Sequence, residues 1–179
     1  GDIIDIDIGM EYPINNKDSK VVNSHSLNGG FFTDMSKTVP VGKVSKETAK
    51  LIKVTKMCLE AGIAQAKPGK TLNDIGRAVQ QLAESNGYGV VRDYVGHGVG
   101  YYAHEEPNVT NYVLPRGGDG DIVLKPGMVI AIEPMINLGT WKVKIINDYT
   151  VITADRSLSA HFEHTVAITE TGCEIITLP

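Results

Sequence analysis

The chain has little cysteine, few aromatic residues and no long apolar segment. It has 179 residues, of which two are cysteines and 6% are aromatic. The cysteines, Cys58 and Cys173, lie far apart in apolar segments, which is typical of buried free thiols in a reducing compartment such as the cytoplasm. No apolar run approaches the roughly 18 residues of a membrane span, so we expect no membrane partner.

An excess of positive charge is also lacking. The 17 basic residues are outnumbered by 21 acidic residues, which gives a net charge of −4 and argues against nucleic acid as the primary partner. The hydrophobic fraction of 42% and the charged fraction of 21% exclude a disordered chain, a collagen and a coiled coil. The length predicts one domain over residues 1–179, since a single core usually holds about 100–200 residues.

The first strand, expected over residues 3–8, has two unlike faces. Alternation puts the acidic residues Asp5 and Asp7 on one face, and Ile4, Ile6 and Ile8 on the other. A polar stretch over residues 15–30 is predicted to be an insertion, and the strand is expected to return over residues 31–39 and to end at Pro40. Because the chain begins inside a strand and without Met, we expect that an N-terminal part of the fold is missing.

Two helices are predicted next. Ser45 is a suitable N-cap for the first, which we expect to continue to Pro68 and Gly69. The second is predicted to begin at Thr71, with a capping box closed by Asp74. The apolar stripes that these helices are expected to bury are Leu51, Ile52, Leu59 and Ile63 in the first, and Leu72, Ile75, Val79 and Leu82 in the second.

The rest of the chain is predicted to form strands. They are expected over residues 88–91, 128–136, 142–153 (as a hairpin), 161–169 and 173–178. Strands, two helices and then strands again predict an α+β fold, in which the helices pack on one face of a curved, mostly antiparallel sheet.

Two segments look like phosphate-binding loops, and neither fits. Ala64 stands where a P-loop needs its first glycine, and residues 64–71 leave a helix rather than a strand. The glycines of residues 96–100 do not have the spacing of a dinucleotide fingerprint.

Four carboxylates lie in otherwise apolar strands. They are Asp7, Asp34, Glu133 and Glu163. Each would incur a desolvation penalty of several kcal/mol unless it were paired or bound to metal. With a neutral His97 from a glycine-rich loop, their four negative charges balance two divalent ions, and such ligands suit Mn, Fe, Co or Zn. Two metal ions about 3.5–4 Å apart are a hydrolase arrangement. The alternative is that the carboxylates form structural ion pairs with Lys37 or Arg92.

The remaining histidines are less informative. Alternation places His161 on the same strand face as Glu163, and His164 on the opposite face or at the sheet edge. His25 lies in the polar insertion and is expected to be solvated.

These motifs resemble the bacterial type I methionine aminopeptidases, which have the pita-bread fold. The resemblance covers nearly the whole chain except residues 15–30, and the block from His97 to Pro107 is its most specific part. The matching segments are Gly1-Asp2-Ile3, Asp34-Met35-Ser36-Lys37, Gly96-His97-Gly98-Val99-Gly100, His104-Glu105-Glu106-Pro107, Pro126-Gly127-Met128, Ile132-Glu133-Pro134-Met135, Leu158-Ser159-Ala160 and Glu163-His164-Thr165.

The resemblance implies two divalent metal ions and a role for each candidate ligand. Asp7 would chelate one ion, Asp34 and Glu163 would bridge the two, and His97 and Glu133 would bind the other. Glu133 would also move the proton of the attacking water, first as base and then as acid. The implied reaction removes the N-terminal methionine from nascent polypeptides whose second residue is small, with the ribosome as an implied partner.

The resemblance also implies substrate-binding residues and two departures from the family. His104 would hydrogen-bond the scissile amide, and Tyr149 would stand at the family's aromatic pocket position. Ala103 stands where an aromatic residue is sometimes found. The insertion of residues 15–30 resembles one in a coccal-type subgroup. The family's N-terminal segment supplies another histidine and much of the methionine pocket. We therefore expect either a clipped product that keeps its N-terminal fragment as a partner, or a sequence without that segment.

Two other functions stay open. An Xaa-Pro aminopeptidase or prolidase would share the fold, although Glu133-Pro134-Met135 and Glu163-His164-Thr165 resemble the methionine-specific branch more closely. A non-catalytic, peptide-binding pita-bread module would typically lose metal ligands, whereas all five candidates are present here.

Overall fold

The computed structural model describes residues 1–12 and 30–178, so most of the predicted insertion, and His25 within it, lie outside the described residues. Strands β1 (Asp2–Tyr12) and β2 (Phe31–Val41) pair antiparallel along their whole length. Pro40 does not end β2 as expected. The pairing of β2 with β10 (Ser159–Ile168) involves residues 35–37, so near Pro40 the strand has one neighbour, and a missing N–H is tolerated there.

Two helices follow, with the predicted caps. In α1 (Lys46–Ile63) the Ser45 hydroxyl accepts a hydrogen bond from the Thr48 N–H at 3.0 Å, and α2 (Leu72–Ser85) begins with the capping box of Thr71 and Asp74. The first helix ends at Ile63 rather than at Pro68, because the chain tightens there into i to i+3 hydrogen bonds. The predicted stripes are buried except for Ile52, Ile63 and Leu82, which are half-buried.

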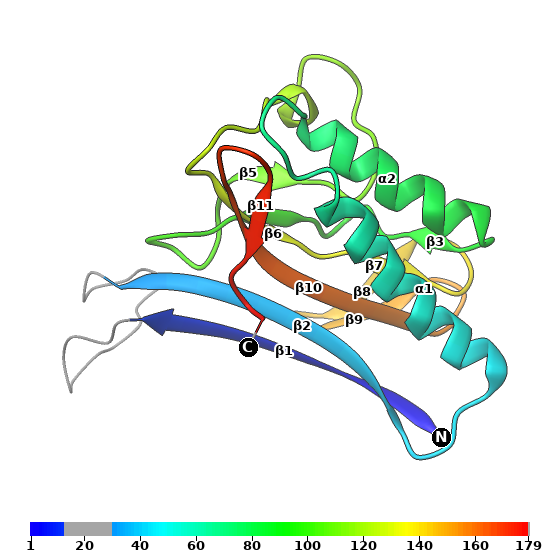
Figure 1. Cartoon of the computed structure of the whole chain (residues 1–179). Coiled ribbons are helices and arrows are strands. Elements are labelled where there is room, and N and C mark those ends of the chain that lie inside the picture. The colour runs from blue at the N-terminus through cyan, green and yellow to red at the C-terminus, as the bar shows by residue number, and fades with distance from the viewer. Residues whose placement is uncertain (13–29, 179) are drawn as a thin grey trace.

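The remaining elements complete one large sheet and a separate hairpin. They are β3 (Gly89–Val90), β4 (Gly96–Gly98), β5 (Glu105–Val109), a 3₁₀ turn (Asp119–Asp121), β6 (Val129–Ile132), β7 (Met135–Asn137), β8 (Val143–Asn147), β9 (Thr150–Thr153), β10 (Ser159–Ile168) and β11 (Cys173–Ile175). The sheet order is β1-β2-β10-β6-β4-β5, with antiparallel neighbours. Figure 1 shows β1, β2 and β10 side by side in this sheet.

The single strand predicted over residues 128–136 is wrong, because the structure divides it into β6 and β7. The break falls at Glu133 and Pro134. A proline cannot donate to a strand ladder, and β10 pairs with β6 on one side of the break and with β7 on the other. Glu133 therefore lies between the two paired segments, near the middle of the sheet.

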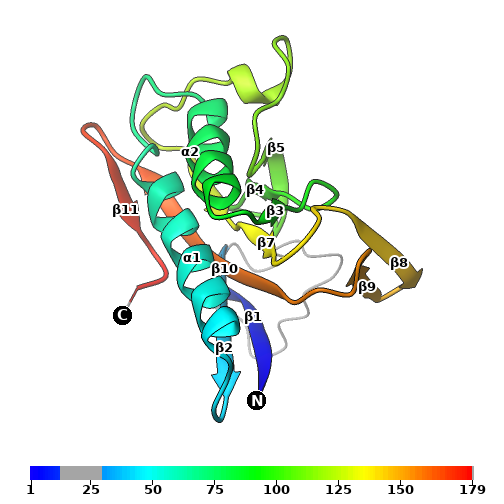
Figure 2. The same cartoon turned by 90° about the vertical axis from the view of Figure 1, so that its right-hand side faces the viewer.

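The helices cover one face of the sheet. Figure 2 shows α1 and α2 side by side on that face. Phe162, Val166 and Ile168 of β10 pack there in one core with residues such as Leu59 and Ile75. Successive strand residues face opposite ways, so Glu163 lies on the other face. The predicted α+β arrangement, with helices on one face of a mostly antiparallel sheet, is confirmed.

Strand β1 forms an edge of the sheet, and the helices do not cover it. Ile4, Ile6, Ile8 and Met10 are 48–60% exposed on the helix-side face.

Cys58 is buried as expected, whereas Cys173 is only half-buried. In the described part of the chain, no helix is both long and apolar enough to cross a membrane.

Candidate metal centre

Neighbouring strands each contribute one chemically active side chain to the face that the helices leave open. Asp7 comes from β1, Asp34 from β2, Glu163 from β10, Glu133 from the end of β6 and His97 from β4. These strands are consecutive in the sheet. The structure therefore brings together all five predicted ligands, although they span residues 7–163 of the sequence.

The five side chains form two groups that share one member. Asp7, Asp34 and Glu163 each offer a ligand atom, and these atoms lie within 4.8 Å of one another. His97, Glu133 and Glu163 form a second group on the same criterion. Two adjacent groups that share a carboxylate have the layout of a dinuclear metal centre.

The carboxylates repel one another and are poorly compensated by other groups. Glu163 is 2% exposed. Its burial, and then the nearby Glu133 and Asp34, raise the pKa of its carboxyl to about 9. Burial and the neighbouring Asp34 also raise the pKa of Asp7. Asp34 Oδ1 and Glu163 Oε1 are buried and have no hydrogen-bond partner among the described residues. Such uncompensated oxygens fit a site for divalent cations.

His97 is oriented as a ligand. Its Nδ1 donates a hydrogen bond to the Gly98 carbonyl at 2.8 Å, which leaves Nε2 free to face the cluster. Nε2 lies 3.4 Å from Glu133 Oε1. A Cβ on Gly96 or Gly98 would collide with the main-chain carbonyl of Ala131 or Glu106, so these glycines allow a close approach of strands rather than binding a phosphate.

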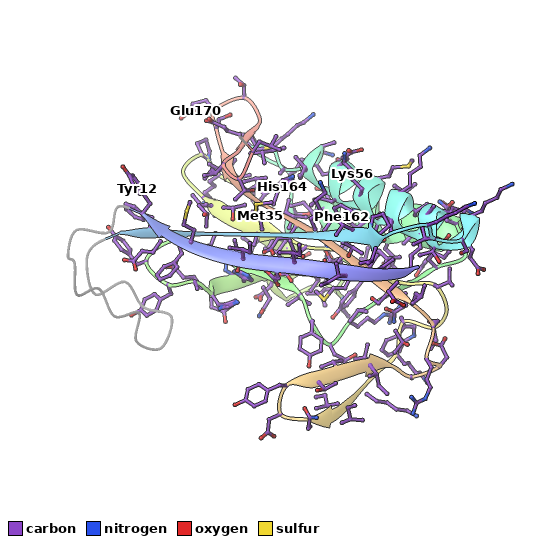
Figure 3. The ribbon with its side chains drawn as sticks, turned by 90° about the horizontal axis from the view of Figure 1, so that it is seen from below. Tyr12, Met35, Lys56, Phe162, His164 and Glu170 are labelled. Atoms are coloured by element: carbon purple, nitrogen blue, oxygen red, sulfur yellow. The ribbon has the colours of Figure 1, made fainter. Side chains whose placement is uncertain are left out.

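Of the two predicted substrate-binding residues, His104 lies beside the cluster and Tyr149 does not. The exposed His104 precedes β5 and forms a further group with Asp34 and His97; its ring centroid is 4.4 Å from that of His97. Tyr149 lies at the turn of the β8–β9 hairpin and is 96% exposed. Figure 3 shows this hairpin standing apart from the main sheet. The structure does not bring Tyr149 to the cluster.

Two side chains that support the cluster were missed in the sequence. The Thr165 hydroxyl accepts a hydrogen bond from the Asp34 N–H and donates one to the Asp34 carbonyl, each at 2.8 Å. The fully buried Asn111 donates from Nδ2 to the Glu133 carbonyl at 3.1 Å, where the strand breaks. Thr165 belongs to the Glu163-His164-Thr165 segment of the resemblance, but its contact with Asp34 depends on the strand pairing, and Asn111 has no sequence signal of its own.

Asp5 and His161 were also missed as members of the site. His161 Nδ1 donates to Asp5 Oδ2 at 3.3 Å, and His161 Nε2 lies 3.5 Å from Glu133 Oε2. Burial alone would lower the pKa of His161, but Asp5 and Glu133 raise it to about 10. Alternation did place Asp5 with Asp7, and His161 with Glu163, and this was the available signal.

The alternative of structural ion pairs finds no support. Lys37 pairs with Ile6 and Phe162, whose side chains lie on the helix-side face. The Arg92 guanidinium lies 4.8 Å from the Trp141 ring centroid and 5.3 Å from that of Tyr112. Among the described residues, no ion pair joins Lys37 or Arg92 to the four carboxylates.

Comparison with known proteins identifies the family. The model of metallopeptidase family M24 matches residues 1–170. The chain belongs to this family. A methionine aminopeptidase from Clostridium acetobutylicum is 46% identical over an alignment of 179 positions, which covers 99% of this M24 chain and 64% of that protein. A crystal structure of methionine aminopeptidase from Thermotoga maritima has a TM-score of 0.84 and 40% identity, and covers 100% of this chain and 65% of that one. Prolidase from Pyrococcus furiosus has a TM-score of 0.69 and 26% identity, over 100% of this chain and 42% of that one.

These likenesses confirm the resemblance to methionine aminopeptidases and the pita-bread fold. The M24 chain spans 64% of the length of the curated relatives from Clostridium acetobutylicum and Bacillus subtilis. Membership of a metallopeptidase family implies the use of divalent metal, and the structure has clusters of side chains that could bind it.

Proposed function

We propose that this chain carries the metal centre of a methionine aminopeptidase, which hydrolyses the N-terminal methionine from polypeptides whose second residue is small. The observation that carries the proposal is the pair of ligand groups that share Glu163. The closer likeness to methionine aminopeptidases than to prolidase supports the methionine-specific branch over an Xaa-Pro peptidase.

Two divalent ions, of Co, Mn, Fe or Zn, are the proposed cofactors. Asp7 would hold one ion, Asp34 and Glu163 would be shared, and His97 and Glu133 would hold the other. When bound, the ions would supply Lewis-acid polarisation of the scissile carbonyl and would acidify a water molecule.

The side chains themselves handle the proton and the substrate amide. Glu133 would accept a proton from the attacking water and return it to the nitrogen of the leaving amine. His104 is exposed beside His97, and it would hydrogen-bond the scissile amide and steady the tetrahedral intermediate. We assign Tyr149 no contact with the metal ligands, because it lies exposed in the turn of the β8–β9 hairpin, outside the cluster.

The proposed partners follow from the proposed reaction. They are the N-termini of nascent polypeptides, and through them the ribosome, in the cytoplasm. A cytoplasmic location is supported by the two free cysteines. The uncovered apolar face of β1 supports a further partner, namely an N-terminal fragment of the same protein.

The test is the release of free methionine from a Met-Ala-Ser peptide as Co²⁺ or Mn²⁺ is added stepwise to the 179-residue chain. We expect metal-dependent release, with no turnover in Glu133→Gln, which keeps the shape of the side chain. Faster cleavage of Xaa-Pro peptides would favour the prolidase alternative. Fewer than one bound ion at saturation would favour the binding module, and full activity of Glu133→Gln would remove its assigned role.

A further inference from the structure

Asp5 is held rigidly beside the candidate metal centre although it is not one of the five candidate ligands. The Ser36 hydroxyl donates to Asp5 Oδ2 at 2.7 Å, and the Thr38 hydroxyl donates to Asp5 Oδ1 at 2.8 Å. Both hydroxyl residues are 2% exposed. Each carboxylate oxygen of Asp5 therefore has a fixed partner on the neighbouring strand.

Thr38 also ties this point to β10. Its hydroxyl oxygen lies 2.8 Å from the His161 main-chain N–H and 2.9 Å from the His161 carbonyl. Residues of β1, β2 and β10 thus meet at one buried hydroxyl, which fixes the backbone from which the His161 ring projects.

The His161 ring lies between two carboxylates. Its Nδ1 donates to Asp5, which turns the opposite nitrogen toward Glu133 Oε2 at 3.5 Å. The ring is 14% exposed, and its buried Nε2 has no hydrogen-bond partner among the described residues. The other Glu133 oxygen, Oε1, lies 3.4 Å from His97 Nε2. The Glu133 carboxylate is therefore flanked by two imidazoles. His97 is one of the five predicted ligands, whereas His161 is not among them, although it forms a further group of possible ligands with Asp5 and Asp7.

We propose that Asp5 and His161 are a positioning pair that fixes the direction of the Glu133 carboxylate. His161 holds the Oε2 side, so Oε1 stays turned toward His97 and the cluster. Groups behind a metal ligand that fix its orientation typically change metal affinity or activity about 10–100-fold when they are removed. The inference deepens the proposed function and rests on it, because it assigns Glu133 both a ligand and a proton-transfer role.

The test compares three variants of the full chain with two matched controls. His161→Leu removes both ring nitrogens, His161→Gln keeps a hydrogen-bond donor, and Asp5→Asn removes the charge but keeps the shape. The control His164→Gln lies on the same strand and the opposite face, and Asp2→Asn is an exposed acid on the same strand as Asp5. Calorimetric titration with Co²⁺, methionine release and thermal unfolding are measured for each.

We expect His161→Leu to weaken the binding of one Co²⁺, the ion that Glu133 would hold, about 10–100-fold and to lower kcat at nearly unchanged KM. His161→Gln should recover most of both losses, and Asp5→Asn should shift both in the same direction by less. The two controls should bind Co²⁺ as the unaltered chain does. The recovery by Gln separates positioning from simple structural damage.

Two results would overturn the inference. One is Co²⁺ binding by His161→Leu and Asp5→Asn within twofold of the unaltered chain. The other is a third Co²⁺ that binds the unaltered chain and is lost in His161→Leu, since His161 would then be a ligand. If the unaltered chain binds Co²⁺ but releases no methionine, the aminopeptidase proposal fails, while the calorimetry still decides the role of Asp5 and His161.

Discussion

Glu163 is the residue on which the candidate site depends most. It is almost fully buried, and it belongs to both ligand groups. With its pKa raised to about 9, it is largely protonated near neutral pH when no cation is bound, and metal binding must displace that proton. A buried carboxyl in this position avoids the desolvation penalty of a buried charge because it stays neutral until a cation binds.

We therefore expect Glu163→Gln to separate metal binding from folding. The variant should hold at most one Co²⁺, against two in the unaltered chain, because the shared carboxylate is lost. Its metal-free melting temperature should change little, since glutamine replaces a carboxyl that is already neutral. Elemental analysis and thermal unfolding by circular dichroism measure the two effects, and retention of two ions would contradict the shared role of Glu163.

His104 should behave differently, because it is exposed and lies outside the two groups that share Glu163. We expect His104→Ala to lower turnover by about 10²–10³-fold, as the loss of one donor to a developing oxyanion does elsewhere. Co²⁺ affinity should fall much less. Parallel kinetics and calorimetry test this, and equal losses in the two would make His104 a metal ligand.

At this scale the sequence predicts the five residues that the structure gathers, but not the residues that hold them. Asp7 and Glu163 stand out as charges in apolar strands. Asp5 is an equally visible charge, but its supporting role is not predictable, nor is that of Thr165 or Asn111, because what they contact depends on which strands become neighbours and in which register. Alternation fixes the face on which a side chain lies, whereas a hydrogen bond across strands requires the register.

At the scale of the elements, hydrophobic periodicity and local motifs predict where helices begin, but they do not predict where a strand is interrupted. The helix caps at Ser45 and Thr71 are local patterns, and they are confirmed. The division of residues 128–136 into β6 and β7 is not local, because it depends on β10 pairing with both pieces. Glu133 lies at that break, so the part of the sheet that was predicted least well carries a central side chain.

Asp155 fixes the base of the β8–β9 hairpin, and this gives a prediction about pH. Its carboxylate accepts hydrogen bonds from the Thr140 N–H at 2.7 Å and the Ser157 N–H at 3.0 Å, and these bonds lower its pKa to about 2 from an ordinary 3.8. The ionised form is favoured in the folded state. The stabilisation is therefore present above about pH 4 and is lost as the pH falls toward 2.

Asp155→Asn should accordingly be less stable than the unaltered chain at pH 6, and the difference should shrink as the pH falls from 4 toward 2. Urea unfolding midpoints at several pH values measure it. Asp148→Asn, in the turn of the same hairpin, is the control for a change in charge. A difference between Asp155→Asn and the unaltered chain that stays constant down to pH 2 would mean that the carboxylate contributes nothing through its charge.

At the scale of the whole molecule, the main unusual feature is the apolar face of β1, which no other element covers in the described part of the chain. A groove of about 770 Å³ runs beside it, lined mainly by apolar residues such as Ile8, Met10, Phe31 and Leu178. Large exposed apolar patches are uncommon on isolated soluble domains. The covered half of the sheet was predictable from the helix stripes, whereas the extent of the bare half depends on how far the helices reach.

We expect the folded chain to bind the dye ANS through this face. The double variant Ile6→Thr and Ile8→Thr should lower the fluorescence several-fold without changing the far-ultraviolet circular dichroism, because threonine keeps the β-branched shape. The matched control is the double variant Ile145→Thr and Val151→Thr, on the separate hairpin. Equal fluorescence from all three proteins would place the bound dye elsewhere.

The origin of the five ligands on different strands also has a consequence in time. No short peptide of this chain contains the site, and it exists only after the first strand and the tenth have joined the same sheet. Cations should therefore act late. They should leave the rate of folding nearly unchanged and slow the rate of unfolding, so that the loaded protein is long-lived as well as stable. In a cell, that lifetime would depend on the supply of metal.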